Sequence, residues 1–208
     1  MIELNKIHNE DCIRFMNENE FKANLIIADF PYKDVVDVEW DTQWKSDKEY
    51  LEWVNTILNG FNGCISENGN ILIYCSRQLE HEFKNILNSI GMYEQRTIIW
   101  ARKRDRNTTR GKTLGSGYEP ILWFSKNEDF TFNSIKISPE PRLLKRKEYQ
   151  EGGRLADGVG LTDVWNDIPS LPHNAKEKVN HPTQKPLLLC DRILNVFSNE
   201  NDLVYIPF

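Results

Sequence analysis

The stretch Leu25-Ile26-Ile27-Ala28-Asp29-Phe30-Pro31-Tyr32 guides the interpretation of the whole chain. Its first four residues form a continuous apolar run, which is typical of a strand buried on both faces in a parallel sheet. The carboxylate of Asp29 and a neighbouring backbone carbonyl can accept hydrogen bonds from the exocyclic amine of a planar base, and the ring of Tyr32 can cover its face. The proline holds the preceding Phe30 in an extended conformation. We therefore expect a site for such a base where this strand ends.

Apolar residues in the rest of the chain alternate between strand and helix patterns. Helical spacing predicts helices over residues 11–18, 47–61, 79–87 and 187–197, and short apolar runs predict strands over residues 2–7, 25–28, 71–74, 97–100, 121–124 and 203–206. This alternation, in units of about thirty residues, is typical of an α/β domain with a mostly parallel sheet. Ligands in such sheets bind at the carboxyl ends of the strands, which is where residues 29–32 fall.

The length and composition of the chain fit one globular domain. At 208 residues it is long enough for a substantial core. No apolar stretch approaches the ~20 residues that span a bilayer. The first residues lack the features of a signal peptide, so we expect a cytoplasmic protein with no membrane partner. The histidines and cysteines lack paired spacing, so we expect buried thiols, no disulfide and no metal site. The cysteines are Cys12, Cys64, Cys75 and Cys190.

The charge of the chain is distributed unevenly. The net charge is −5, but residues 96–154 contain 14 Lys and Arg against 7 Asp and Glu, and the remainder contains 12 basic and 24 acidic residues. A basic segment in an acidic protein indicates a polyanion that binds one face, although a solvated surface loop would have the same composition. Two clusters within the segment suit phosphate groups. They contain Arg102, Lys103, Arg104, Arg106, Arg110 and Lys112, and Arg142, Lys145, Arg146 and Lys147.

Four elements resemble, in type and in order, those of the β group of amino DNA methyltransferases, the N-4/N-6 DNA methylase family. Ile7-His8-Asn9-Glu10-Asp11-Cys12 is similar to the strand end that contacts the cofactor adenine, and Asp29-Phe30-Pro31-Tyr32 resembles the Asp-Pro-Pro-Tyr motif. Asp163-Val164-Trp165-Asn166-Asp167-Ile168-Pro169 and His181-Pro182-Thr183-Gln184-Lys185-Pro186 resemble two later elements of the group. The second of these is the most specific of the four. The resemblance covers nearly the whole chain.

The resemblance implies a Rossmann-like S-adenosylmethionine-dependent methyltransferase sheet in permuted order, forming a single methyltransferase domain over residues 1–208. The implied reaction is methylation of the N6 amine of a flipped-out adenine in double-stranded DNA. The catalytic residues would be Asp29, Phe30, Pro31 and Tyr32, with the amine held by the Asp29 carboxylate and the Phe30 carbonyl. The cofactor-binding residues would be Asp11, Cys12, Asp29, His181, Thr183, Gln184, Lys185 and Phe208. Asp11 can equally cap the first helix.

In the family, target recognition lies between the Asp-x-Pro-Tyr and His-Pro-Thr-Gln-Lys-Pro elements. Both basic clusters fall in this interval, so the resemblance implies a basic, DNA-binding target-recognition insert over approximately residues 102–172. Phosphate contacts of this kind supply affinity but not sequence preference. Cytosine N4 is the alternative target. The family's cytosine enzymes more often have Ser in place of Asp29, which favours adenine.

The sequence departs from the family pattern at two places. Phe30 stands where the first proline of the motif is commonest. In the segment Leu203-Val204-Tyr205-Ile206-Pro207-Phe208, Ile206 stands where the family usually has Asp, and no glycine-rich turn follows. We therefore expect a sheet that is incomplete at its C-terminal end and is completed by a homodimer partner or a complementing C-terminal segment. The alternative is a truncated, catalytically inactive remnant that binds DNA without modifying it.

Overall fold

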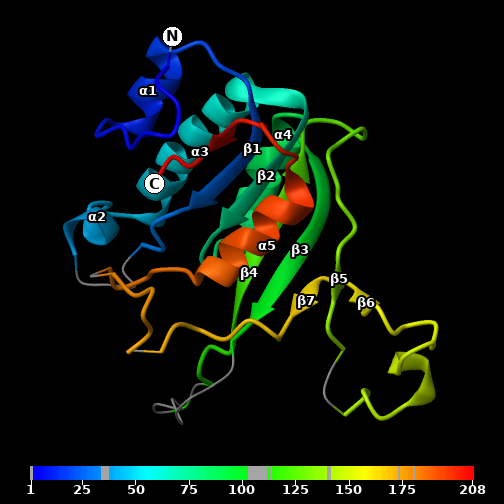
Figure 1. The fold of residues 1–208 in the computed structure, drawn as a ribbon. Coiled ribbons are helices and arrows are strands. Elements are labelled where there is room, and N and C mark those ends of the chain that lie inside the picture. The colour runs from blue at the N-terminus through cyan, green and yellow to red at the C-terminus, as the bar shows by residue number, and fades with distance from the viewer. Residues whose placement is uncertain are drawn as a thin grey trace.

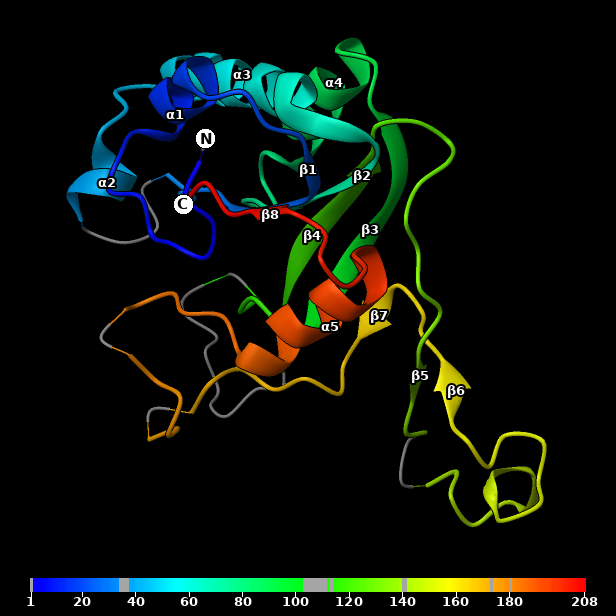
Figure 2. The same ribbon diagram turned by 45° about the horizontal axis from the view of Figure 1, so that its top comes forward.

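The computed structural model of the chain describes residues 2–33, 38–102, 112, 114–139, 142–172, 174–179 and 181–208. Its body has three layers, with a mixed sheet between two layers of helices (Figures 1 and 2). Helices α1, α3 and α4 cover one face of the sheet and helix α5 covers the other. Their bounds are Cys12–Glu18 for α1, Asp47–Cys64 for α3, Glu80–Ser89 for α4 and Leu187–Phe197 for α5. The four helices predicted from the sequence are thus confirmed.

The central sheet has six strands in the order β7-β3-β4-β2-β1-β8. Among the strands that the structure describes in this sheet, only β4 runs against the others, since it is antiparallel to both β2 and β3. The remaining pairs, β1 with β2, β1 with β8, and β3 with β7, are parallel. The mostly parallel α/β sheet is therefore confirmed. The bounds are Ala23–Asp29 for β1, Ile65–Tyr74 for β2, Tyr93–Ala101 for β3, Tyr118–Ser125 for β4, Val164–Trp165 for β7 and Val204–Tyr205 for β8.

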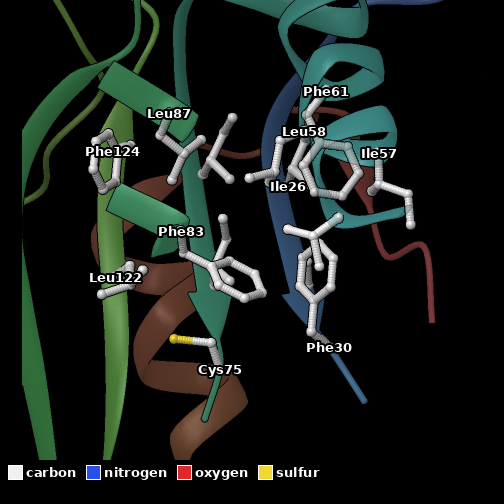
Figure 3. Close-up of a cluster of buried hydrophobic side chains, with 14 of the residues drawn as sticks. Ile26, Phe30, Ile57, Leu58, Phe61, Cys75, Phe83, Leu87, Leu122 and Phe124 are labelled. Carbon is white, nitrogen blue, oxygen red and sulfur yellow. The ribbon is translucent and has the colours of Figure 1, made fainter. Parts of the chain in front are cut away.

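Successive side chains of β1 enter two separate hydrophobic cores. Ile26 points toward α3 and α4, where it packs in one core with Ile57 and Phe83 (Figure 3). Leu25 points to the opposite face and shares a second core with Leu189 of α5. Because both faces of this strand are covered, it needs no polar alternation. The continuous apolar run of β1 follows from this double burial.

The register of the sheet brings several strand ends to one edge. Asp29 at the end of β1 pairs with Tyr74 at the end of β2, and the N–H of Phe30 donates to the carbonyl of Tyr74 at 3.2 Å. Strand β3 ends at the same edge, because Ala101 pairs with Tyr118. Since β4 runs in the opposite direction, it contributes its first residues here. The edge therefore collects the ends of three strands and the beginning of a fourth.

Part of the chain between β4 and β7 leaves the body as an arm. Strands β5 (Lys136–Ile137) and β6 (Val159–Gly160) pair in a separate two-stranded sheet, and the 3-10 helix η1 (Lys147–Tyr149) lies between them along the chain. Figures 1 and 2 show this arm extending away from the three layers. The insert predicted over residues 102–172 is thus not one unit, because β4 and β7 within it belong to the central sheet.

Several elements differ from the sequence prediction. Residues 2–7 form no strand, and Ile7 is 94% exposed. Both edges of β1 are already paired, with β2 and β8, so the opening segment has no partner there. Strand β2 begins at Ile65 and not near residue 71. Its first residue pairs with Ala23 of β1, and the register then shifts before Asn70 pairs with Leu25. The short helix α2 (Glu39–Thr42) was not predicted, because four residues carry too little periodicity.

The four thiols are free, and three of them are buried as predicted, whereas Cys190 is half-buried. Burial raises the pKa of Cys12 and of Cys64 to about 11, so both stay protonated at neutral pH. No helix in the described ranges is long and apolar enough to cross a membrane. Across those ranges, His, Cys, Asp and Glu side chains form no group of three or more that could hold a metal ion.

Candidate active site

A cavity of about 800 Å³ opens at the edge of the sheet where the strand ends meet. Small-molecule and cofactor sites usually have volumes of about 300–1,000 Å³, so the cavity is large enough for such ligands. Its walls come from the ends of β1, β2 and β3, the start of β4, and the segment that precedes α5. It brings together most of the residues with a predicted catalytic or cofactor role and one predicted DNA-binding residue, Arg102. The former are Asp29, Phe30, Pro31, Tyr32, His181, Thr183, Gln184, Lys185 and Phe208.

A close ion pair links β1 to the segment before α5. The ammonium of Lys185 donates to both oxygens of the Asp29 carboxylate, at 2.8 Å and 2.6 Å. The same ammonium lies 4.8 Å from the centre of the Tyr74 ring and 5.7 Å from that of the Tyr32 ring. The Lys185 side chain is only 12% exposed, so little of this charge is compensated by water. The pair therefore depends on the protein groups around it.

The pKa of the Asp29 carboxyl reflects opposing influences. Burial raises this pKa above its ordinary value, the ammonium of Lys185 opposes the rise, and the charge of Glu119 adds to it. The balance is a raised pKa, so the folded chain retains the proton of Asp29 to a higher pH than a free aspartate would. Lys185 is thus the main protein group that favours the carboxylate form.

A second carboxylate, that of Glu119, lies beside this pair at the start of β4. One of its oxygens accepts a hydrogen bond from the hydroxyl of Tyr32 at 3.3 Å and lies 3.8 Å from the ammonium of Lys185. Its other oxygen is 2.9 Å from the guanidinium of Arg102, which also donates to the hydroxyl of Ser116. Asp29, Glu119, Lys185 and Arg102 therefore form a network of two anions and two cations.

The turn after Asp29 is fixed from both sides. The ring of Phe30 is buried in the core, with its centre 5.0 Å from that of Phe83 and 4.9 Å from that of Phe208. The carbonyl of the next residue, Pro31, accepts a hydrogen bond from the hydroxyl of Tyr50 at 2.7 Å. Packing of the Phe30 ring and the bond from Tyr50 to Pro31 therefore hold the turn in place.

The segment before α5 is held in place by its own side chains. The amide of Gln184 accepts from the N–H of Val179 at 2.7 Å and donates to the carbonyl of Glu177 at 2.8 Å. The hydroxyl of Thr183 lies 3.4 Å from a ring nitrogen of His181. Gln184, which the sequence predicts to bind cofactor, is thus occupied within the chain, and it shapes the cavity wall through the position of its neighbours.

Two residues with a predicted cofactor role lie outside the cavity lining. The Asp11 carboxylate caps α1 by accepting a hydrogen bond from the N–H of Arg14 at 2.9 Å, and the Cys12 side chain is buried beneath the same helix end. The alternative role of Asp11 as a helix cap is therefore observed. The described lining of the cavity includes neither residue.

The basic residues predicted to bind DNA occupy two places. Arg102 lines the cavity and Lys112 is exposed, whereas the second cluster is exposed on the arm around η1. This second cluster comprises Arg142, Lys145, Arg146 and Lys147. The predictions for Lys103, Arg104, Arg106 and Arg110 lie outside the described residues.

Several residues of the cavity were not predicted from the sequence. Glu119 and Tyr118 begin a strand whose reversed direction no periodicity reveals, so their arrival at this edge could not be foreseen. Trp40, in the short helix α2, lies over His181 with ring centres 6.1 Å apart and an angle of 15° between the ring planes. A single Trp in a helix of four residues gives little signal in the sequence. The ring of Tyr118 also covers the guanidinium of Arg77 at 5.1 Å.

The sequence of the chain is similar to those of known DNA methyltransferases. The sequence model described as DNA methylase matches residues 23–208. The type II methyltransferase M1.MboII of Moraxella bovis is 32% identical over 98% of this chain and 83% of its own length. The DNA adenine methyltransferase YhdJ of Escherichia coli is 27% identical over 89% of this chain and 64% of its own length. The chain spans 50–59% of three further relatives.

Solved structures show the same fold. The M1.HpyAVI complex with SAM has a TM-score of 0.58 at 22% identity, over 97% of this chain and 81% of that chain. The cytosine-N4-specific PvuII DNA methyltransferase has a TM-score of 0.65 at 13% identity, over 95% of this chain and 71% of that chain. These likenesses confirm the Rossmann-like methyltransferase sheet expected from the sequence. With the match over residues 23–208 and the 32% identity to M1.MboII, they establish that the chain belongs to the N4/N6 family of DNA methylases.

Proposed function

We propose that this chain binds S-adenosylmethionine and transfers its methyl group to the N6 amine of adenine in DNA. The placement of Asp29 supports the proposal most directly. Its carboxylate lies on the wall of the cavity and accepts two hydrogen bonds from an amine nitrogen, that of Lys185. Both carboxylate oxygens thus accept N–H donors, and the neutral, planar exocyclic amine of adenine would present its N–H groups to the same acceptors. Asp29 is thus oriented to bind the target amine.

The adenine amine is a poor nucleophile, because its lone pair is delocalised into the ring. Hydrogen bonds from its two protons to the Asp29 carboxylate and the Phe30 carbonyl favour a pyramidal nitrogen with a localised lone pair. Both acceptors sit on a turn held by the buried Phe30 ring and by the bond from Tyr50 to Pro31. Fixed acceptors of this kind act by alignment and need no reorganisation during the reaction.

The residues of the cavity fit S-adenosylmethionine. The Thr183 hydroxyl suits a carboxylate, which the positive charge of Lys185 in the same cavity wall also favours, and Trp40 and Phe208 offer aromatic surface for an adenine ring. The carboxylates of Asp29 and Glu119 place negative charge beside a sulfonium. When bound, the cofactor supplies an activated methyl group on that sulfonium, so the chain has only to align it with the amine.

Tyr32 has a role in stacking on the target base, and Asp29 has a role in accepting its proton. The hydrogen bond from the Tyr32 hydroxyl to Glu119 fixes the ring beside Asp29, where it can stack on a flipped-out base. As the new N–C bond forms, the nitrogen must lose a proton. Asp29 is placed to accept it, and its raised pKa improves it as a proton acceptor.

DNA would be held mainly through its phosphates. The four exposed basic residues on the arm, Arg142, Lys145, Arg146 and Lys147, are suited to this role, as is Arg102 at the cavity. We assign target recognition to the arm and to the chain between β3 and β4, which also carries Lys103, Arg104, Arg106, Arg110 and Lys112. These phosphate contacts explain affinity and leave base preference to other side chains.

The test combines cofactor binding, methyl transfer and identification of the product. Calorimetry with S-adenosylmethionine should give measurable heat, and the tritiated cofactor should label unmethylated genomic DNA. Digestion of that DNA to nucleosides should release N6-methyladenine. N4-methylcytosine as the labelled product would establish the alternative target. DNA binding with no heat from millimolar cofactor would instead identify a chain that binds DNA without modifying it.

A further inference from the structure

The Lys185–Asp29 pair raises a difficulty for the proposed reaction. An incoming target amine needs the carboxylate that the Lys185 ammonium already occupies at 2.6–2.8 Å. Because it donates to both oxygens, the ammonium competes with the target amine for them, and entry of the base is favoured when the ammonium leaves Asp29. Its side chain is 12% exposed, so a displaced and unpaired charge would be costly in this partly dry site. The ion needs a second partner close to the first.

Glu119 is placed to be that partner. The nearer oxygen of its carboxylate lies 3.8 Å from the Lys185 ammonium, so a movement of about 1 Å would give a normal charge-assisted hydrogen bond. Lysine suits such an exchange, because its ammonium is a compact charge on a flexible stem. The Glu119 side chain is 16% exposed and would receive the ion away from bulk water.

The partners of Glu119 keep it in position during this exchange. Arg102 holds one carboxylate oxygen at 2.9 Å, and the hydroxyl of Tyr32 donates to the other at 3.3 Å. Arg102 is itself anchored by a bond to the Ser116 hydroxyl at 3.0 Å. The carboxylate thus stays fixed while the lysine moves, and it retains capacity for the ammonium on the oxygen that faces Lys185.

We propose that Glu119 is a positioning residue that receives Lys185 from Asp29 when the target base enters, and so frees the catalytic carboxylate. The inference rests on the proposed function, because it concerns the entry of the target amine. It assigns Lys185 two positions within one network of charges. Lys185 keeps a carboxylate partner in both positions, while Asp29 exchanges the ammonium for the N–H donors of the target amine.

The first test is structural and does not require enzymatic activity. Replacement Asp29→Asn removes the charge that holds Lys185 while keeping the shape of the side chain. A crystal structure of this variant should show the Lys185 ammonium within about 3 Å of the Glu119 carboxylate. The double variant with Glu119→Gln is the matched control, in which the ammonium should turn toward solvent. A Lys185 side chain that turns to solvent in the single variant, or stays beside residue 29, would overturn the proposal.

The second test separates this role from a structural one. Glu119→Gln keeps oxygen and nitrogen atoms for Tyr32 and the same side-chain volume, but it loses the charge that receives the ammonium. We expect kcat to fall about 10- to 100-fold, because the base enters less readily. The affinities for DNA and for S-adenosylmethionine should stay within about twofold, since base entry follows binding. A loss confined to DNA affinity, or no loss of kcat, would contradict the proposal.

The two tests distinguish failure of this inference from failure of the proposed function. If the unaltered chain transfers no methyl group to DNA, the proposed function fails, and the Asp29→Asn structure still decides whether Glu119 receives Lys185. If methyl transfer to adenine is observed and Lys185 does not move to Glu119, the proposed function stands and the inference fails.

Discussion

Two carboxylate–cation pairs involve helix α5 or the segment just before it, and they differ in what surrounds them. Asp29 and Lys185 face the cavity, and their charges are shared with a second carboxylate. Asp167 and Arg192 form a two-bond pair at 2.8 Å and 2.6 Å, with the guanidinium 5.3 Å from the centre of the Trp165 ring. The described lining of the cavity includes neither Asp167 nor Arg192.

The difference follows from the chemistry of the two cations. The planar fork of Arg192 matches the carboxylate of Asp167 with two parallel bonds and stacks on an aromatic face, so it has one favoured position. The ammonium of Lys185 has no such fixed geometry and can be exchanged between neighbouring carboxylates. A fixed pair suits a role in stability, whereas an exchangeable pair suits a role in the reaction. The following predictions test this contrast, from the largest expected effect to the smallest.

Removing the charge of Asp29 should affect activity and leave stability almost unchanged. For Asp29→Asn we expect methyl transfer to fall by about 1,000-fold or more, because the amine loses its main acceptor. The unfolding midpoint should change little, since Lys185 has Glu119 nearby. Tritium transfer and thermal unfolding measure the two effects. Activity within tenfold of the unaltered chain would show that Asp29 does not hold the amine.

Removing the charge of Arg192 should have the opposite profile. Arg192 is 7% exposed, and Arg192→Met removes the two hydrogen bonds that its guanidinium donates to the Asp167 carboxylate. We expect a loss of about 2 kcal/mol in the free energy of unfolding, less than for a fully buried pair because Asp167 is 37% exposed. Urea unfolding measures it, and Arg192→Lys should lose less. A variant with normal stability and no activity would reverse the contrast.

Lys185→Met should change the pH dependence of methyl transfer. The pKa of Asp29 is raised by burial and held down by Lys185, so removing the ammonium raises it further. Because the proposed reaction needs the carboxylate form, activity is lost as pH falls through this pKa, and the acid limb of the kcat/KM profile, which reports the free enzyme, should move to higher pH. At neutral pH we expect a change of no more than about tenfold. An acid limb that stays in place or moves to lower pH would contradict this assignment.

The smallest effect is expected near the fixed pair. The indole N–H of Trp100 donates to the carbonyl of Ile168 at 2.8 Å and ties the segment after β7 to β3. Trp100→Phe keeps an aromatic ring and loses this bond, which should cost about 1 kcal/mol in the free energy of unfolding. Chemical denaturation measures the difference. A loss as large as that of Arg192→Met would show that the ring, and not the bond, holds the segment.

The sequence alone determined the framework of the protein. Helical spacing located α1, α3, α4 and α5, and the apolar run before Asp29 located β1, because local periodicity reports which faces are buried. The same reasoning, with the family motifs, selected the residues of β1 and of the segment before α5 that meet at the cavity. Strand direction and edge pairing leave no such local signal, which is why residues 2–7 were wrongly expected to form a strand.

Only the tertiary structure decided which charges meet. Asp29 and Lys185 are separated by 156 positions, and Tyr32 and Glu119 by 87, so no local pattern could join them. Glu119 reaches the cavity because β4 runs against its neighbours, and the amide of Gln184 is bonded to the backbone of residues 177 and 179. Burial, direction and distance are properties of the packed chain, and they determine how the residue types fixed by the sequence act on one another.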